Sequence, residues 1–273
     1  MEATRIAAPE TQVYFVGAGP GDPKLLTIRA KEVLESVDAV LYDRLVSNEV
    51  LNVIPKTVRL IDVGKSPHSR TLTQGEITLL IISLVKNGKT VARLKGGDSL
   101  LFSRGSEEAT ALRRNGISFE IVPGITSAIG ATAYAGIPLT HRDYSSSVLI
   151  ATGHECYDKN KKRIDWRKVP TSSVDTIVLL MGVERFPQIA SELILGGLDP
   201  KTPVAAVQWG TTNKQRTTFF TLVQGKVAGA SLLQSPSVIV VGSVVSLAEQ
   251  LGWWMENDQS SANMITPPRE NTG

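Results

Sequence analysis

Short apolar runs alternate with amphipathic stretches through the first half of the chain, and this alternation restricts the folds open to it. Each run of four or five residues suits a buried strand, and the stretches between them carry apolar residues at helical spacing. A helix between two strands returns the chain to the same end of the sheet, so successive strands run parallel. The pattern predicts an α/β fold on a mainly parallel sheet, with strands at 13–16, 39–42, 58–61, 90–94 and 119–122.

The helical stretches carry signals for where they begin and which face they bury. Thr73 and Glu76 have the spacing of a capping box, in which each side chain bonds the backbone N–H of the other. This box opens a helix that ends near Lys86, and further helices are expected at 27–36 and 106–114. The inward face of the helix at 27–36 is expected to comprise Ala30, Val33 and Leu34.

A second series of elements follows a break at Pro123 and Gly124. It begins with a helix of small residues at 126–135 and an irregular link at 137–142. The later strands are expected at 148–151, 177–180, 204–207 and 238–241, and the later helices at 187–195 and 246–254. We therefore expect an N-terminal domain at 12–124, a linking helix and loop at 125–146, a C-terminal domain at 147–254, and disordered polar tails at 1–11 and 257–273.

Composition narrows the class of protein. Hydrophobic residues make up 42% of the chain and charged residues 20%, which is typical of a globular protein. The net charge is only +3, and the basic residues are spread out, which disfavours a nucleic-acid binder. No apolar run reaches the roughly 20 residues that span a bilayer. The single cysteine, Cys156, allows no intrachain disulfide and suits the cytoplasm, and the scattered histidines show no metal-ligand spacing.

The glycine-rich stretch GAGPGD, at 17–22, follows the first expected strand and suggests a ligand loop. A dinucleotide loop would offer backbone N–H groups to a pyrophosphate, with Asp43 at the end of the second strand holding a ribose. Pro20 has no N–H to donate, and Asp22 would bring negative charge towards the phosphates. A turn that binds nothing is the other alternative, and the loop by itself does not exclude it.

A second glycine motif, RLKGGD at 93–98, overlaps the end of another expected strand. In open α/β sheets, ligands bind at the carboxyl ends of the strands, so two glycine loops there favour a binding site over two turns. The aspartate of this motif can accept a hydrogen bond from a ribose hydroxyl or an ammonium group. Neither loop suits a phosphate. The pair indicates a cationic, nucleoside-like cofactor, and S-adenosylmethionine has that chemistry.

With these loops in place, the chain resembles the uroporphyrinogen-III C-methyltransferases of the tetrapyrrole methylase family. The resemblance extends over about residues 12–252. GPGD marks the wider family, whereas YDRLV, LKGGD and PLTHR are more specific to this activity. The segments that carry it are VGAGPGDP, LLT, LYDRLV, VGK, RLKGGD, VPGITS, YAGIPLTHR, TGH, LMG and QWGTT.

The resemblance implies a two-domain tetrapyrrole methylase fold, with a mixed sheet in the C-terminal domain and the cofactor in the interdomain cleft. It also implies a homodimer that methylates carbons 2 and 7 of uroporphyrinogen III with S-adenosylmethionine, leaving S-adenosylhomocysteine and needing no metal. The product is precorrin-2, a precursor of sirohaem and cobalamin. The implied cofactor-binding residues are Pro20, Gly96, Gly97, Asp98, Leu101, Thr126, Ser127, Met181, Gly210 and Ser237.

The resemblance also implies the residues that handle protons and substrate. Asp43 is the expected base and Lys65 the expected acid. An ion pair with Arg44 or a helix cap would explain Asp43 as well, and a solvated loop lysine would explain Lys65. The substrate carries eight carboxylates, which arginine binds in bidentate geometry. The expected substrate-binding residues are Arg44, Arg104, His141 and Arg142.

The chain departs from the family pattern after the second glycine motif. Ser99, Ser103 and Ser106 stand where the family commonly has a proline and two glycines. A serine at a glycine position is costly only where the backbone needs a positive φ. This departure leaves open a cofactor-binding module without catalysis, such as a sensor. A family member that acts on another corrin precursor or on RNA is a further alternative, which the YDRLV and PLTHR segments disfavour.

Overall fold

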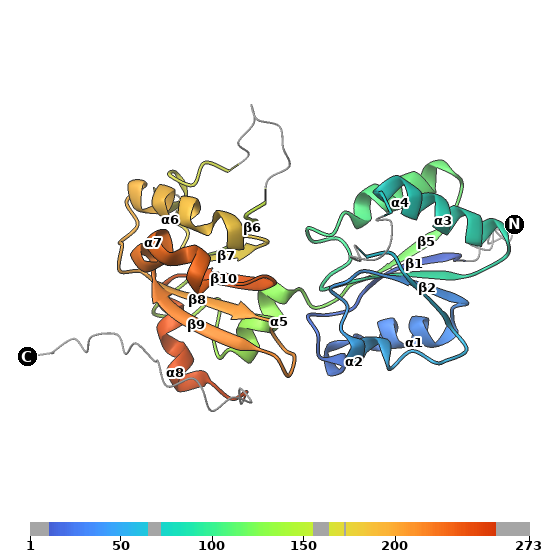
Figure 1. Ribbon diagram of the computed structural model, residues 1–273, viewed down its shortest axis with the longest axis horizontal. Helices are drawn as coiled ribbons and strands as arrows, with labels where there is room; N and C mark the ends of the chain where they lie inside the picture. The colour runs from blue at the N-terminus through green and yellow to red at the C-terminus, as the bar shows by residue number, and fades with distance from the viewer. Residues whose placement is uncertain (1–10, 65–71, 155–163, 172, 255–273) are drawn as a thin grey trace, which may run out of the picture. The chain divides into compact units, whose positions relative to one another are not determined.

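Five parallel strands form the first sheet of the computed structural model, which describes residues 11–64, 72–154, 164–171 and 173–254 (Figure 1). The strand order is β3-β2-β4-β1-β5, with every neighbouring pair parallel. The strands are β1 (Val13–Gly17), β2 (Ala39–Tyr42), β3 (Arg59–Asp62), β4 (Val91–Lys95) and β5 (Phe119–Val122). The predicted parallel sheet is confirmed, and it brings the carboxyl ends of all five strands to one edge.

Helices cover both faces of this sheet. They are α1 (Ile28–Ser36), α2 (Asn48–Leu51), α3 (Gln74–Lys86) and α4 (Gly105–Arg114). Figure 1 shows α1 and α2 on one face and α3 and α4 on the other. Alternate strand residues point to opposite faces, so Ala92 and Leu94 pack with α1 while Val91 packs with α3 and α4. The face of α1 made by Ala30, Val33 and Leu34 is buried as predicted.

The predicted capping box is confirmed at the start of α3. The backbone N–H of Glu76 donates to Thr73 Oγ1, and the backbone N–H of Thr73 donates to Glu76 Oε2. Two of the helix's unpaired N–H groups are thereby satisfied. Helix α2 is a single turn with no counterpart among the predicted elements. It is capped by Ser47, whose hydroxyl also donates to the carbonyl of Gly21.

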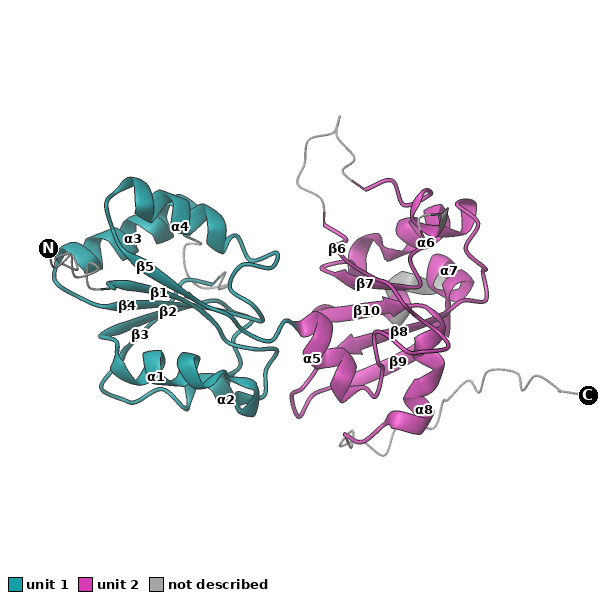
Figure 2. Cartoon of the chain, turned by 180° about the vertical axis from the view of Figure 1, so that it is seen from behind, with its two compact units in different colours: residues 1–126 teal, residues 127–273 magenta. Residues whose placement is uncertain are grey.

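The chain divides into two compact units at residues 126 and 127, coloured separately in Figure 2. The second unit holds a mixed sheet of order β6-β7-β10-β8-β9, in which only β6 and β7 pair in parallel. Its strands are β6 (Val148–Thr152), β7 (Thr176–Leu180), β8 (Pro203–Gln208), β9 (Arg216–Thr221) and β10 (Ser237–Val241). The mixed sheet is the one that the resemblance implied.

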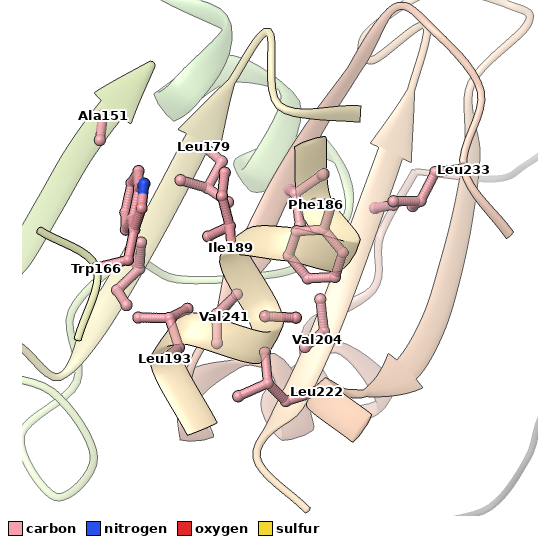
Figure 3. Close-up of a cluster of buried hydrophobic side chains, with 14 of the residues drawn as sticks. Ala151, Trp166, Leu179, Phe186, Ile189, Leu193, Val204, Leu222, Leu233 and Val241 are labelled. Carbon is pink, nitrogen blue, oxygen red and sulfur yellow. The ribbon is translucent and has the colours of Figure 1, made fainter. Parts of the chain in front are cut away.

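The second sheet is also covered on both faces. Its helices are α5 (Ser127–Tyr134), α6 (Phe186–Leu195), α7 (Leu222–Leu232) and α8 (Ala248–Leu251), with short 3₁₀ turns at Val169–Thr171, Val183–Arg185 and Ser243–Leu247. Phe186, Ile189 and Leu193 of α6 fill the core cluster drawn in Figure 3. On the opposite face, Ala128 and Ala131 of α5 pack with Val178 and Val240. Helix α5, from the expected linking segment, therefore belongs to the core of the second unit.

Two elements of the second unit were not predicted, namely β9 and α7. Helix α7 carries glycines and a weak apolar stripe, so its sequence gives little helical signal. Gly225 explains why the helix fits here, because a Cβ at this position would lie 2.4 Å from a ring carbon of Phe186 and 2.7 Å from one of Phe220. The helix is thus selected by its packing against two aromatic rings.

No helix in the described part of the chain is both long and apolar enough to cross a membrane. The predicted tails lie outside the described residues apart from Thr11.

Candidate active site

Two glycine loops are joined at the carboxyl edge of the first sheet. The N–H of Ala18 donates to the carbonyl of Lys95 at 2.8 Å. Gly19 and Gly97 exchange both backbone hydrogen bonds, at 3.1 and 2.8 Å, and form an isolated antiparallel bridge. The N–H groups of Ala18 and Gly19 are therefore occupied by the loop after β4. They are not offered to a phosphate, as they would be in a dinucleotide loop.

Glycines let three loops at this edge touch through their backbones. A Cβ on Gly17 would lie 2.5 Å from the Cα of Gly124, and a Cβ on Gly124 would lie 2.4 Å from the carbonyl oxygen of Gly97. Side chains at these positions would push apart the loops after β1, β4 and β5. Close backbone approach, rather than ligand contact alone, thus requires glycine in this part of the motifs.

Asp98 holds the same edge together through its carboxylate. Oδ1 accepts from the N–H groups of Leu100 and Leu101, both at 2.9 Å, and Oδ2 accepts from the N–H of Gly124 at 3.0 Å. Burial by itself would raise the pKa of Asp98, but backbone hydrogen bonds, led by that from Gly124, outweigh it and hold the pKa below its ordinary value. Asp98 therefore shapes the loop that carries Leu101, whose side chain is exposed.

The chain after β1 also departs from a dinucleotide-binding fold. Pro20 lies between Gly19 and Gly21, both at positive φ, and a 3₁₀ turn at Pro23–Leu25 follows instead of a long helix. Asp22 caps that turn by accepting from the N–H of Lys24 at 2.8 Å. Helix α1 begins later and is capped by Thr27. No helix N-terminus therefore directly follows the glycine loop to receive a pyrophosphate.

The chemistry of this edge fits S-adenosylmethionine, which carries an ammonium and a sulfonium group and no phosphate. The groups in the two loops are backbone amides and the carboxylates of Asp22 and Asp98. Arg93 and Lys95, the cations of the adjoining strand, are buried and bonded to carboxylates. The loops thus favour a cationic ligand over an anionic one.

The serines that depart from the family pattern are compatible with this backbone. The residues of the loop at positive φ are Phe102 and Arg104, not Ser103, and Ser106 lies in the first turn of α4. Neither serine is therefore strained by standing at a family glycine position. The hydroxyl of Ser103 donates to the carbonyl of Ser99 and accepts from the N–H of Gly105.

Asp43 lies just beyond the end of β2, and its partner differs from the expected one. Its Oδ1 accepts from Arg93 Nη2 at 2.6 Å, and its Oδ2 lies 3.8 Å from Lys95 Nζ. The expected alternative, an ion pair with Arg44, is wrong, because the neighbouring strand β4 supplies a better-placed guanidinium. The side chain of Asp43 remains 32% exposed, so it can still accept a hydrogen bond from a ligand.

Arg93, Lys95 and Glu108 form a buried charged group next to Asp43 that the sequence reasoning missed. Glu108 Oε2 accepts from Arg93 Nε at 3.0 Å, and Glu108 Oε1 accepts from Lys95 Nζ at 2.8 Å. A signal for it was present in the sequence. Two basic residues two positions apart within a buried strand point to the same face, and each needs an acidic partner from the element covering that face.

In the second unit, three predicted cofactor residues lie at one edge of the sheet. β7 and β8 both run antiparallel to β10, so their carboxyl ends lie beside the first residue of β10, Ser237. Met181 follows β7 with a positive φ of 53° and a side chain that is 54% exposed. Gly210 follows β8, and a Cβ there would lie 2.3 Å from the Cβ of Ala131 in α5. This edge therefore gathers Met181, Gly210 and Ser237.

A buried glutamine fixes the loop after β8 and was also missed. Gln215 Oε1 accepts from the N–H of Thr211 at 2.7 Å, and Gln215 Nε2 donates to the carbonyl of Tyr134 at 3.3 Å. Trp209 and Thr211, on either side of Gly210, both have positive φ. Thr211 is only four residues away, but Tyr134 is 81 residues away, so the local sequence does not show that Gln215 connects the two. Of the remaining predicted cofactor residues, Thr126 ends the first unit and Ser127 begins α5.

The predicted substrate residues fall in different places. Arg44 is exposed next to Asp43. Arg104 precedes α4 and pairs with Glu107 at 2.7 Å. The turn that holds His141 and Arg142 is tied by backbone bonds to Ser145, whose hydroxyl contacts Thr176 at the amino end of β7.

That turn therefore lies at the opposite end of β7 from Met181, so the second unit does not bring the two together. The predicted acid, Lys65, lies outside the described residues. Within the described ranges, no group of three or more His, Cys, Asp or Glu residues could hold a metal ion.

Comparison with known proteins decides the family. Residues 12–224 match the family model described as Tetrapyrrole (Corrin/Porphyrin) Methylases. The chain belongs to this family. The match includes both glycine loops, Asp43 and the edge of Met181 and Gly210, so the resemblance seen in the motifs is confirmed.

Individual relatives of this tetrapyrrole methylase are similar over most of its length. The uroporphyrinogen-III C-methyltransferase of Bacillus subtilis (strain 168) is 45% identical over 244 residues, which cover 89% of this chain and 94% of that protein. The siroheme synthase of Chromobacterium violaceum is 44% identical over 92% of this chain but only 53% of its own length. This chain spans about half the length of the siroheme synthases that it matches.

A solved structure shows the same fold. The uroporphyrin-III C-methyl transferase of Thermus thermophilus, complexed with S-adenyl homocysteine, aligns with a TM-score of 0.73 and 38% identity. The alignment covers 86% of this chain and 93% of that chain.

Proposed function

We propose that this chain is a uroporphyrinogen-III C-methyltransferase, which transfers methyl groups from S-adenosylmethionine to carbons 2 and 7 of uroporphyrinogen III and yields precorrin-2. The observation that carries the proposal is the 45% identity to the Bacillus subtilis enzyme over 94% of that enzyme's length. The two joined glycine loops support it, because they leave no phosphate site and suit a cationic cofactor.

The bound cofactor supplies a methyl group that is activated by its sulfonium charge. The chain's own residues hold it in line with the accepting carbon, which is itself nucleophilic, so no covalent enzyme intermediate is required. In the first unit we assign cofactor contacts to Pro20, Gly96, Gly97, Asp98, Leu101 and Thr126. In the second unit we assign them to Ser127, Met181, Gly210 and Ser237.

Asp43 is assigned the role of accepting a pyrrole N–H and stabilising the positive charge that builds up on the macrocycle. Arg93 occupies its Oδ1, while among the described residues Oδ2 has only the more distant Lys95 as a cationic neighbour and retains capacity to accept. Lys65 is assigned as the acid by the resemblance. Arg44 and Arg104 are assigned to substrate carboxylates, because both are exposed arginines beside the strand-end loops.

His141 and Arg142 keep their proposed substrate role on the resemblance alone. We also propose that the protein forms a homodimer and is located in the cytoplasm. A molar mass from light scattering after gel filtration, close to twice the 29.4 kDa chain, would support the dimer.

The activity can be tested by incubating the protein with uroporphyrinogen III and S-adenosylmethionine without oxygen. We expect a product that carries two added methyl groups, each gained with the loss of one proton, and that oxidises to a red-fluorescent compound. The matched variant is Asp43→Asn, which should lower turnover and leave cofactor affinity nearly unchanged. Cofactor binding without turnover by the unmodified protein would instead favour a sensor of S-adenosylmethionine.

A further inference from the structure

Four charged side chains meet behind the carboxyl edge of the first sheet, and only one of them, Asp43, has a role in the chemistry described above. Arg93 and Lys95 come from β4, Glu108 from α4 and Asp43 from the end of β2. Arg93, Lys95 and Glu108 are almost completely buried, whereas Asp43 is 32% exposed. The two positive and two negative charges balance, and Asp43 is the member that reaches the surface.

Glu108 is the centre of this group. Its two carboxylate oxygens are divided between two cations: Oε2 accepts from Arg93 Nε, and Oε1 accepts from Lys95 Nζ. Because the side chain is 0% exposed, both bonds form without competition from water. Glu108 therefore sets where both cations lie.

The guanidinium of Arg93 links Glu108 to Asp43. Its Nη1 donates to the carbonyls of Leu41 and Leu94, at 3.3 and 3.2 Å, while Nη2 donates to Asp43. All three nitrogens of this planar group are thus bonded, and their directions are set together. If Nε, which is bonded to Glu108, moved, the rigid guanidinium would carry Nη2 with it and shift the carboxylate of Asp43.

We propose that Glu108 is a positioning residue for methyl transfer, which fixes the Asp43 carboxylate at the strand end through Arg93 and Lys95. This inference rests on the proposed function and on the role assigned to Asp43 there. Glu108 differs in this from Glu107, the exposed acidic residue of α4, because its buried side chain is out of reach of a ligand. Its effect on the reaction passes through the orientation of Asp43.

The test is a double-mutant cycle between Glu108→Gln and Asp43→Asn, with turnover measured anaerobically and cofactor affinity measured by calorimetry. Glutamine keeps the size of Glu108 but places an N–H₂ group against one of the two cations. We expect Glu108→Gln to lower kcat about ten- to hundredfold, because small misplacements of reacting groups cost this much. The Kd for S-adenosylmethionine should stay within about twofold of wild type, since no cofactor loop contains Glu108.

In the Asp43→Asn background, the same Glu108→Gln change should alter kcat less than about twofold, because Glu108 acts through the residue already removed. The control is Glu120→Gln, which removes the exposed ion pair with Arg29 in the same unit and should leave kcat unchanged. Additive losses in the double variant, or full activity in Glu108→Gln, would overturn the proposal.

If Glu108→Gln does not fold, Arg93→Lys replaces it in the same cycle. Lysine keeps the charge but cannot bond Glu108 and Asp43 together, so the same non-additive loss is expected. A wild-type protein that binds cofactor and fails to methylate would reject the proposed function itself. An active wild type with additive variants rejects only the role of Glu108.

Discussion

The N–H of Gly124 donates a 3.0 Å hydrogen bond to Oδ2 of Asp98, and this single bond ties the loop after β5 to the loop after β4. The other oxygen of the same carboxylate accepts from Leu100 and Leu101. The carboxylate of Asp98 therefore stabilises the backbone of its own loop and of the neighbouring loop. Any contact that it makes with a cofactor comes in addition to these bonds.

Asp98→Ala should weaken binding of S-adenosylmethionine at least about tenfold, because hydrogen bonds to a charged group contribute about 1.5–3 kcal/mol. The loop that carries Leu101 would lose its shape. Titration calorimetry measures the effect. Asp38→Ala is the control, since Asp38 bonds Thr90 at the amino end of the sheet, and it should leave cofactor affinity unchanged. Equal affinity in Asp98→Ala and wild type would contradict the assignment.

The stability that Asp98 contributes should depend on pH. Its pKa in the folded protein lies below the ordinary value of 3.8, so the folded state favours the ionised carboxylate. The contribution is fully present above the ordinary pKa and is lost as the pH falls through the folded value. Thermal denaturation of wild type and Asp98→Asn between neutral and strongly acidic pH should show wild type more stable at neutral pH, with the difference shrinking in acid. A constant difference would argue against a titrating Asp98.

Gly124→Ala should destabilise the first unit by about 3 kcal/mol or more, because overpacking against rigid backbone costs at least the usual 1–3 kcal/mol. Its Cβ would lie 2.4 Å from the carbonyl oxygen of Gly97 and 2.6 Å from the Cα of Gly17. Gly75→Ala is the matched control. Its Cβ would meet nothing closer than Thr73 Oγ1 at 4.0 Å, and an alanine in α3 should stabilise by about 0.5 kcal/mol. Urea denaturation should show a lower free energy of unfolding for Gly124→Ala and a higher one for Gly75→Ala, each relative to wild type.

Ser99→Ala should stabilise the protein by about 1 kcal/mol, because a buried hydroxyl without a partner is costly. Ser99 Oγ is buried and has no hydrogen-bond partner among the described residues. Ser103→Ala is the contrasting variant and should cost about 1 kcal/mol, since that hydroxyl makes two hydrogen bonds. If Ser99→Ala loses cofactor or substrate affinity instead, the hydroxyl has a ligand as its partner.

Met181→Gly should be more stable than Met181→Ala by about 1 kcal/mol, because a residue with a Cβ is strained in the left-handed region. Met181 has a φ of 53°, and its largely exposed side chain contributes little packing. Both variants should bind S-adenosylmethionine more weakly than wild type. Chemical denaturation and cofactor titration of the two variants, compared side by side, check both expectations. Wild-type affinity in both would remove Met181 from the cofactor site.

Much of the first unit could be predicted because its signals are local. The capping box of Thr73 and Glu76, the buried face of α1 and the alternation of strands and helices each depend on residues close together in the chain. The glycine loops were recognisable for the same reason. The backbone conformation of such loops requires glycine, and this requirement is visible in the local sequence.

The features that escaped prediction depend on partners distant in the sequence. Asp43 and Arg93 are 50 residues apart, and only the pairing of β2 with β4 brings them together. Helix α7 lies where it does because Gly225 packs against two phenylalanine rings, and no local sequence pattern predicts that contact. Backbone preferences and residue spacing thus identify the elements and the ligand loops. Which charges neutralise one another, and which carboxylate remains open to a ligand, follows only from tertiary packing, because burial forces each charge to find a partner across the fold.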